Sequence, residues 1–197
     1  MLEAAIRFVD REGLDALSMR KLGSDLGVEA MSLYNHVPSK GALLDGMVEV
    51  LLRKLELPPA DEDWEARIRE AYRGFRRLAH AHPNVFPIFV VRPPDTMDGA
   101  WLVEIFLETM LDAGFDGETA LYAFRALTSY TVGYVMSEIR GFAMEPTAER
   151  AGALQLPPEK FPRITKLSAQ LVDIDRDTEF EFGLDLIFCG LRAKLEG

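Results

Sequence analysis

The chain has 197 residues, of which 48% are hydrophobic and 27% charged, and its formal net charge at pH 7 is −10. This length suffices for one large domain or two small ones with hydrophobic cores. Neither a signal-peptide pattern nor about 18 consecutive uncharged apolar residues occurs, so we expect a cytoplasmic protein without a membrane partner. The single cysteine, Cys189, excludes an intrachain disulfide framework and a cysteine zinc site, and its apolar surroundings predict a buried thiol.

Hydrophobic periodicity predicts an all-α fold that begins with a helix over residues 1–12. Its apolar residues recur at helical spacing, and Gly13 follows as a stop signal. Residues 18–40 then resemble two short helices joined by a tight turn at Gly27. Ser18 is a good N-cap, and Gly23 lacks a side chain where a second helix would approach closely. The pattern predicts a helix-turn-helix in which the core-facing residues of the second part are Val28, Leu33 and Val37.

The outward face of the second short helix carries residue types that contact DNA. Asparagine can pair with adenine, apolar groups can meet a thymine methyl, and hydroxyls and cations bind phosphate oxygens. A plain surface helix in a small bundle is the alternative, and spacing alone leaves both open. The candidate DNA-binding residues are Ser18, Arg20, Ala30, Met31, Ser32, Tyr34, Asn35, His36 and Lys40.

Charge is distributed unevenly along the chain. Residues 1–54 hold seven Lys and Arg against eight Asp and Glu, so nearly all the net negative charge belongs to the remainder. A near-neutral head is unusual for a DNA reader, which normally shows a basic face. A helical, dimeric ligand-binding or interaction module that no longer binds DNA is therefore the alternative function.

A fourth helix is expected from residue 40 to about 55, followed by the proline-rich and acidic break Leu57-Pro-Pro-Ala-Asp-Glu-Asp63. We therefore divide the chain into domains 1–56 and 57–197. Trp64 opens a helix to about Ala81, whose arginines are expected to form a solvated face. Prolines interrupt the apolar stretch that follows, Val85 to Val91, where we expect irregular structure with one short helix.

Three longer helices and one modest helix complete the chain. We expect helices over 96–113, 117–142 and 164–172, a loop over 143–160, and a closing helix over 178–195. The closing helix is apolar nearly all round, so it must be buried on both sides. In an isolated chain it would leave a large exposed apolar patch, which indicates a dimer partner.

Three motifs of the first part resemble the DNA-binding domain of tetracycline-repressor (TetR) family regulators: Leu17-Ser-Met-Arg-Lys-Leu22, Leu33-Tyr-Asn-His-Val37 and Lys40-Gly-Ala-Leu-Leu-Asp45. The second part resembles the tetracycline-repressor C-terminal domain at Trp64, Phe75-Arg76, Arg92-Pro93 and Phe182-Gly-Leu-Asp-Leu-Ile-Phe-Cys-Gly-Leu191. The resemblance implies a ligand-responsive transcriptional regulator, a repressor, that binds double-stranded DNA at a palindromic operator. It also implies a homodimer through helices 117–142 and 178–195, with a small-molecule effector pocket in each subunit.

The resemblance also implies roles at the DNA. Arg20, Ala30, Met31 and Ser32 would lie at base edges, and the later residues nearer the backbone. Ala30 and Met31 stand where tetracycline repressors have Gln-Pro, so the operator sequence does not carry over. Family members commonly have a basic arm ahead of the first helix, and here Met1 begins almost inside that helix, so we expect an N-terminally shortened chain from which that arm is missing.

The effector of the tetracycline repressors does not carry over either. They hold a magnesium–tetracycline chelate partly through a histidine in the segment where this chain has Ile88 to Val91, and Ala71, Phe106 and Ser137 replace other polar ligands. An apolar or aromatic effector fits the residues present better. The candidate lining residues are Phe75, Phe86, Phe89, Trp101, Phe106, Tyr130 and Tyr134, and the candidate polar anchors are Arg125, Ser129 and Ser137. Plain core packing is the alternative for each aromatic.

No pattern of the chain indicates catalysis or a cofactor. His80 and His82 lack the further ligands that zinc requires, and we expect no metal site. The sequence has no nucleophile motif, no phosphate-binding glycine loop and no His-Glu-x-x-His. An enzyme using a cavity of the large domain is the remaining, distant alternative.

Overall fold

The computed structural model describes residues 1–91, 97–141, 156–172 and 175–196, and these ranges contain helices and no strand. The first helices are α1 (Leu2–Glu12), the 3-10 helix η1 (Leu14–Ala16), α2 (Met19–Leu26), α3 (Ala30–Tyr34) and α4 (Lys40–Leu52). The later helices are α5 (Trp64–Ala81), α6 (Pro87–Val91), α7 (Met97–Asp112), α8 (Gly117–Arg140), α10 (Pro162–Lys166), α11 (Ser168–Val172) and α12 (Arg176–Glu196). The all-α prediction is confirmed.

Side-chain caps explain why the sequence locates several helix starts well. The Ser39 hydroxyl accepts a hydrogen bond from the Ala42 amide, 3.1 Å away, and α4 begins at the next residue. Asp63 and Asp116 cap α5 and α8 in the same way. The helix expected over 164–172 is instead two short helices, α10 and α11. The loop expected over 143–160 falls mostly on residues 142–155, outside the described residues.

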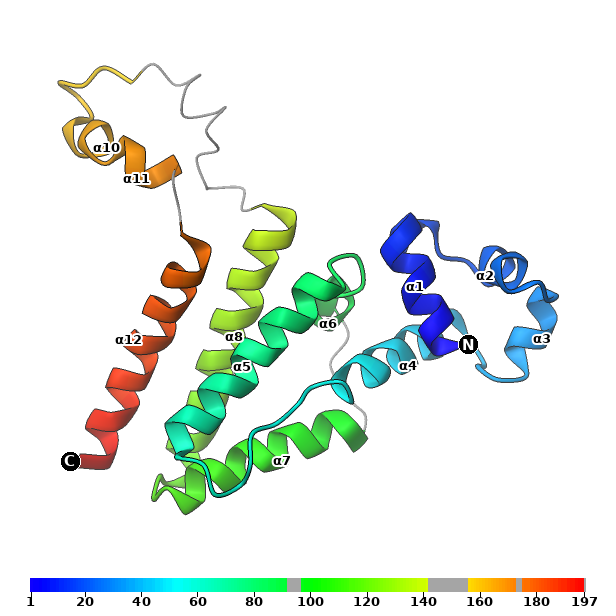
Figure 1. Cartoon of the computed structure of the whole chain (residues 1–197), viewed down its shortest axis with the longest axis horizontal. Helices are drawn as coiled ribbons and strands as arrows, with labels where there is room; N and C mark the ends of the chain where they lie inside the picture. The colour runs from blue at the N-terminus through cyan, green and yellow to red at the C-terminus, as the bar shows by residue number, and fades with distance from the viewer. Residues whose placement is uncertain (92–96, 142–155, 173–174, 197) are drawn as a thin grey trace.

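A first hydrophobic core holds α1 to α4 together and extends beyond them. It buries Leu22, Leu33 and Leu43, and it also includes Leu78 of α5 and Ile88 of α6. Figure 1 shows α1, α2 and α3 at one end of the molecule, with α4 leading from them to the remaining helices. The predicted domain boundary near residue 56 is thus crossed by a shared core.

Polar contacts strengthen the junction between α1 and the segment after α5. The Nδ1 atom of His82 lies 2.7 Å from the Asp10 carboxylate, and the Asn84 amide donates to the Asp10 backbone carbonyl at 3.0 Å. These contacts join the first helix directly to the larger part of the chain, so α4 is not the sole connection.

A second core packs α5, α7, α8 and α12 against one another. α12 lies alongside α8 and buries one stripe of its surface, formed by Phe180, Leu184, Phe188 and Leu191. Trp64 at the start of α5 packs edge-on against Phe115, with ring centroids 5.1 Å apart. α10 and α11 lie apart from the other helices in Figure 1 and are exposed along their described side chains.

The prediction that the α5 arginines form a solvated face is wrong for several of them. Arg76 is 15% exposed and binds Glu138 of α8, with its Nη2 atom 2.6 Å from the carboxylate. Arg69 and Arg73 both bind Glu181 of α12. Acidic residues of α8 and α12 lie opposite these arginines only after the helices have packed, which helix periodicity in α5 alone does not reveal.

The other face of α8 and α12 is apolar and uncovered in the single chain. Phe182 and Leu186 of α12 are 62% and 61% exposed, and Leu121 and Tyr122 of α8 are also exposed. Cys189 is exposed, so the prediction of a buried thiol is wrong. The reason is geometric, since α12 packs on α8 and contacts side chains of α5 along one side only, which leaves the opposite side of α12 uncovered in the single chain.

Candidate nucleic-acid interface and ligand cavity

Close packing of α2 against α3 builds the helix-turn-helix. The Ser18 hydroxyl caps α2 by accepting from the Lys21 amide at 3.2 Å, and Gly27 ends the helix in the left-handed conformation, with φ of 69°. A methyl group on Gly23 would lie only 2.9 Å from the Val28 carbonyl oxygen. The absence of a side chain at Gly23 is therefore required by the approach of the turn.

The exposed residues of this segment form the candidate nucleic-acid interface. Leu33 and Val37 are buried as expected, but Val28 is 45% exposed, so its assignment to the core is wrong. Val28 lies in the turn between α2 and α3, where no helix covers it. Met31 is 72% exposed, and the other exposed candidates are Arg20, Tyr34, Asn35, His36 and Lys40.

Three of the candidate DNA-binding side chains already have partners within the motif. The Ser18 hydroxyl is the α2 cap, and the Ser32 hydroxyl donates to the Glu29 carbonyl at 2.7 Å. The Lys40 ammonium donates to the Leu17 carbonyl at 2.7 Å, which ties the start of α4 to the segment before α2. Ala30 is half-buried beside Gly23. Met31 and Tyr34 are the large side chains that α3 leaves exposed.

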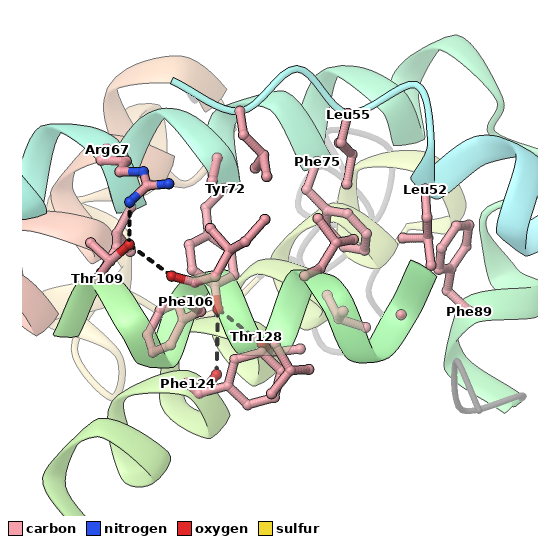
Figure 2. Close-up of a pocket in the computed structure, with 18 residues that line it drawn as sticks. Leu52, Leu55, Arg67, Tyr72, Phe75, Phe89, Phe106, Thr109, Phe124 and Thr128 are labelled. Atoms are coloured by element: carbon pink, nitrogen blue, oxygen red, sulfur yellow. Dashed lines mark hydrogen bonds between the residues drawn. The ribbon is translucent and has the colours of Figure 1, made fainter. Parts of the chain in front are cut away.

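A cavity of about 190 Å³ lies between the end of α4 and helices α5, α7 and α8. Figure 2 shows aromatic and aliphatic side chains from these helices and from α6 around it. Its apolar lining consists of Leu52, Leu55, Leu57, Ile68, Ala71, Phe75, Phe89, Leu102, Val103, Ile105, Phe106, Phe124 and Val132, with Gly99. The lining is therefore apolar and partly aromatic, and its use as the effector site stays a prediction.

Four polar side chains enter the wall of the cavity: Arg67, Tyr72, Thr109 and Thr128. The Tyr72 hydroxyl lies 3.0 Å from the Thr128 hydroxyl, and burial raises the pKa of Tyr72, so the phenol stays protonated. The Arg67 guanidinium donates from Nη1 to the Thr109 hydroxyl at 2.8 Å. The cavity lining is thus mostly apolar, with two hydrogen-bonded pairs of polar side chains in its wall.

The structure brings three of the ten candidate effector residues to this cavity: Phe75, Phe89 and Phe106. Phe86 lies outside the lining and packs on Phe75 and Phe89, with ring centroids 5.2 and 5.5 Å away. Trp101 is 64% exposed. The other five candidates, none of which lines the cavity, are Arg125, Ser129, Tyr130, Tyr134 and Ser137.

Those five residues of α8 have other surroundings. Arg125 and Ser129 are exposed. The Tyr130 and Tyr134 hydroxyls donate to backbone carbonyls of α12, at Phe180 and Arg176, both at 2.9 Å. Burial raises the pKa of Tyr130 to about 12. The Ser137 hydroxyl donates within α8 to the Tyr134 carbonyl. These tyrosines therefore attach α8 to α12.

Helical spacing holds a signal that could have located the missed lining residues. On α8 the cavity is lined by Phe124, Thr128 and Val132, which follow one another at intervals of four. Arg125 and Ser129 belong to the adjacent stripe, which points elsewhere. On α5, residues 67, 68, 71 and 72 share the face of Phe75. Including the other residues on the same face of α5 as Phe75 would have identified Arg67 and Tyr72 as lining residues.

Comparison with known proteins identifies the family. Residues 1–47 match the model of bacterial regulatory proteins of the tetR family, and residues 57–195 match the tetracyclin repressor-like C-terminal domain. The chain belongs to the TetR family. It is therefore a DNA-binding transcriptional regulator of the repressor type, with a ligand-binding C-terminal domain, and not an enzyme.

Individual relatives of this TetR-family chain align along almost its whole length. The class D tetracycline repressor protein of Escherichia coli is 31% identical, covering 99% of this chain and 88% of that protein. The transcriptional repressor DrrR1 of Streptomyces coeruleorubidus is 32% identical, over 98% of this chain and 76% of that protein. The structure of the Streptomyces coelicolor TetR family protein ActR with actinorhodin superposes with a TM-score of 0.86 at 31% identity, covering 100% and 96% of the two chains.

Two absences concern the part of the chain that the structure describes. No helix there combines the length and hydropathy needed to span a membrane. Among the same residues, no three His, Cys, Asp or Glu side chains group as metal ligands would. His80 and His82 bind Glu138 and Asp10 respectively. The two histidines thus face different helices.

Proposed function

We propose that the chain is a ligand-responsive repressor that binds a palindromic operator as a homodimer and is released from it by a small, largely apolar or aromatic effector. In this proposal residues 1–56 bind DNA, and residues 57–197 bind the effector and form the dimer. The observation that carries it is the position of α4, which belongs at once to the core of the helix-turn-helix and to the wall of the cavity.

The two ends of α4 support this coupling. Leu43 and Met47 are fully buried in the core that includes α1 to α3, whereas Leu52 lines the cavity. Arg53 directly after α4 binds Asp98 of α7, on the opposite cavity wall. An effector that changes the spacing of α4 and α7 would move the helix-turn-helix. It can do so only through different affinities for the two arrangements.

The cavity supports the effector class. Its lining is apolar apart from four side chains, and aromatic rings from α5, α6, α7 and α8 contribute to it. Apolar pockets with a few polar points are typical small-molecule sites. The related ActR chain is described in complex with actinorhodin, which agrees with a small-molecule effector for this fold.

The exposed apolar face of α8 and α12 supports the homodimer, and it yields a first prediction. Replacing Phe182 and Leu186 together by glutamate should convert the dimer to monomers, because four carboxylates would have to be desolvated in a symmetric interface. Sedimentation velocity at micromolar concentration measures the outcome. Met97→Glu, which introduces the same charge at an exposed methionine of α7, should leave the dimer intact. A double variant that remains dimeric would place the interface elsewhere.

Selection of bound sequences from a random DNA duplex pool tests operator binding. A dimer that holds its recognition helices about one DNA turn apart, roughly 34–36 Å, should enrich a palindrome with that half-site spacing. Its affinity should fall steeply with salt, because phosphate contacts release counterions. If no palindrome is enriched even at low salt, the proposal of a homodimer on a palindromic operator fails.

Variants of α3 give the second prediction. Replacing both Met31 and Tyr34 by alanine should weaken binding to the selected operator by about tenfold or more, since each base or phosphate contact contributes about 1–3 kcal/mol. Fluorescence anisotropy with labelled duplex measures this loss. Met97→Ala, at an exposed methionine far along the chain on α7, serves as control and should bind like the parent. Unchanged operator affinity in the double variant would mean that α3 does not face the DNA.

A further inference from the structure

Arg67 differs from the other arginines of α5 in having no carboxylate partner among the described residues. Arg69, Arg73, Arg76 and Arg77 each form at least one ion pair. Arg67 forms none with the described residues, and its guanidinium makes a single side-chain hydrogen bond there, to Thr109. Its Nε atom is buried without any partner. A cationic group with an unused donor therefore stands in the wall of an apolar cavity.

The hydroxyl next to Arg67 does not complete its hydrogen bonding. Thr109 is buried, and its hydroxyl hydrogen is committed to the Ile105 carbonyl at 2.7 Å, so toward Arg67 it acts as an acceptor. The other polar pair of the cavity, Tyr72 and Thr128, is hydrogen-bonded internally, and Tyr72 also approaches the Phe124 carbonyl. The polar atom of the described lining that is buried without a partner is thus Nε of the Arg67 guanidinium.

The polar and apolar side chains of the lining lie at different ends of the cavity. Figure 2 shows Arg67 and Thr109 at one end of the cavity, while Leu52, Phe75 and Phe89 lie at the other. A buried unpaired donor costs free energy, and a buried charge costs more unless a counter-charge is present. A ligand that presents an anionic acceptor at the Arg67 end and an apolar body at the other would satisfy both ends.

We propose that the effector is a small aromatic acid, bound with its carboxylate on the Arg67 guanidinium and its rings among Leu52, Phe75 and Phe89. This inference rests on the proposed function, because it concerns the same cavity. The cavity volume of about 190 Å³ exceeds the roughly 150 Å³ of an engineered cavity that takes benzene, so a one- or two-ring body fits. Charge-assisted hydrogen bonds to the guanidinium would make the protein prefer a carboxylate ligand over an uncharged analogue of the same shape.

Isothermal titration with 2-naphthylacetate and its uncharged analogue 2-naphthylacetamide tests the assignment. We expect the parent protein to bind the carboxylate at least about tenfold more tightly than the amide. Arg67→Gln should abolish that preference while leaving amide affinity unchanged, and Arg67→Lys should restore part of it. Arg77→Gln, which removes an exposed arginine of the same helix, should keep the full preference.

The outcomes separate this inference from the proposed function. Equal binding of both probes to the parent, or a preference that survives in Arg67→Gln, would overturn the carboxylate assignment and leave the cavity as an apolar site. If neither probe binds at millimolar concentration, the aromatic-acid assignment fails, whereas the proposed repressor function is still decided by operator selection. Ala71→Phe, which adds a ring inside the cavity, should abolish binding of both probes and so locate them. Retained amide binding shows that the Arg67 variants are folded.

Discussion

Replacing Arg76 by methionine should destabilise the protein by about 3–5 kcal/mol, the largest stability effect that we expect from a single charge. Arg76 forms two hydrogen bonds with Glu138, whose side chain is only 4% exposed, and its guanidinium lies over the Phe180 ring at 4.8 Å. The variant leaves a buried carboxylate with His80 as its remaining partner. Urea denaturation at a fixed protomer concentration measures the loss, since dimer stability depends on concentration.

Two controls separate the orphaned charge from lost packing. Arg77→Met removes the next arginine of α5, which is mostly exposed and pairs with Glu70, and should cost less than about 1 kcal/mol. Adding Glu138→Gln to Arg76→Met should recover part of the stability, because the buried charge is gone. If Arg76→Met alone costs no more than Arg77→Met, the ion pair does not stabilise the α5–α8 contact.

The pH dependence of the Arg76→Met effect follows from Glu138. Burial favours the neutral carboxyl, but the hydrogen bonds from Arg76 and His80 outweigh it and lower the pKa of Glu138. A lowered folded-state pKa adds stability above the unfolded value, about 4.3, and that stability is lost as pH falls through the folded pKa. Without Arg76, burial should raise the pKa of this carboxyl above the unfolded value of about 4.3, so the variant protonates it before the parent does as pH falls. The destabilisation by Arg76→Met should therefore be greatest near neutral pH, begin to shrink above about pH 4.3, and be largely gone below the lowered pKa of Glu138 in the parent.

Gly23→Ala should lower affinity for the selected operator by at least about tenfold, or 1.4 kcal/mol. The added methyl group would lie 2.9 Å from the Val28 carbonyl oxygen and 3.2 Å from the Ala30 amide nitrogen. Both atoms are backbone, so the clash is relieved only by moving the turn and tilting α3. Alanine itself favours helix by about 1 kcal/mol, so the variant should lose DNA binding without a matching loss of stability.

A matched glycine controls for the Gly23 result. A methyl group on Gly46 of α4 would approach the Leu2 side chain at 2.7 Å, but that contact is with the far end of a flexible side chain. Gly46→Ala should therefore bind operator within about threefold of the parent, well inside the tenfold change per 1.4 kcal/mol. Equal anisotropy curves for Gly23→Ala and the parent would show that the turn geometry does not set the position of α3.

The cavity was only partly predictable because its described walls come from five helices, α4 to α8. Phe75, Phe89 and Phe106 could be chosen as aromatic residues on separate predicted helices. Tyr130 and Tyr134 are also aromatic residues on a predicted helix, yet their hydroxyls bond to α12. Which face of α8 meets α12 is decided by the packing of the helices and not by the sequence of α8 alone. Arg67 was missed since an arginine on a charge-rich helix normally faces solvent.

The sequence by itself determined the helices, their caps and the helix-turn-helix, because capping hydroxyls and carboxylates, turn glycines and helical periodicity act within a few residues. Ser18, Ser39, Asp63 and Asp116 begin helices whatever lies beyond them. Only the tertiary structure decided which faces of α5, α8 and α12 meet. It paired Arg76 with Glu138, left Nε of Arg67 without a partner among the described residues and exposed Cys189, because each depends on residues brought together from distant positions in the chain.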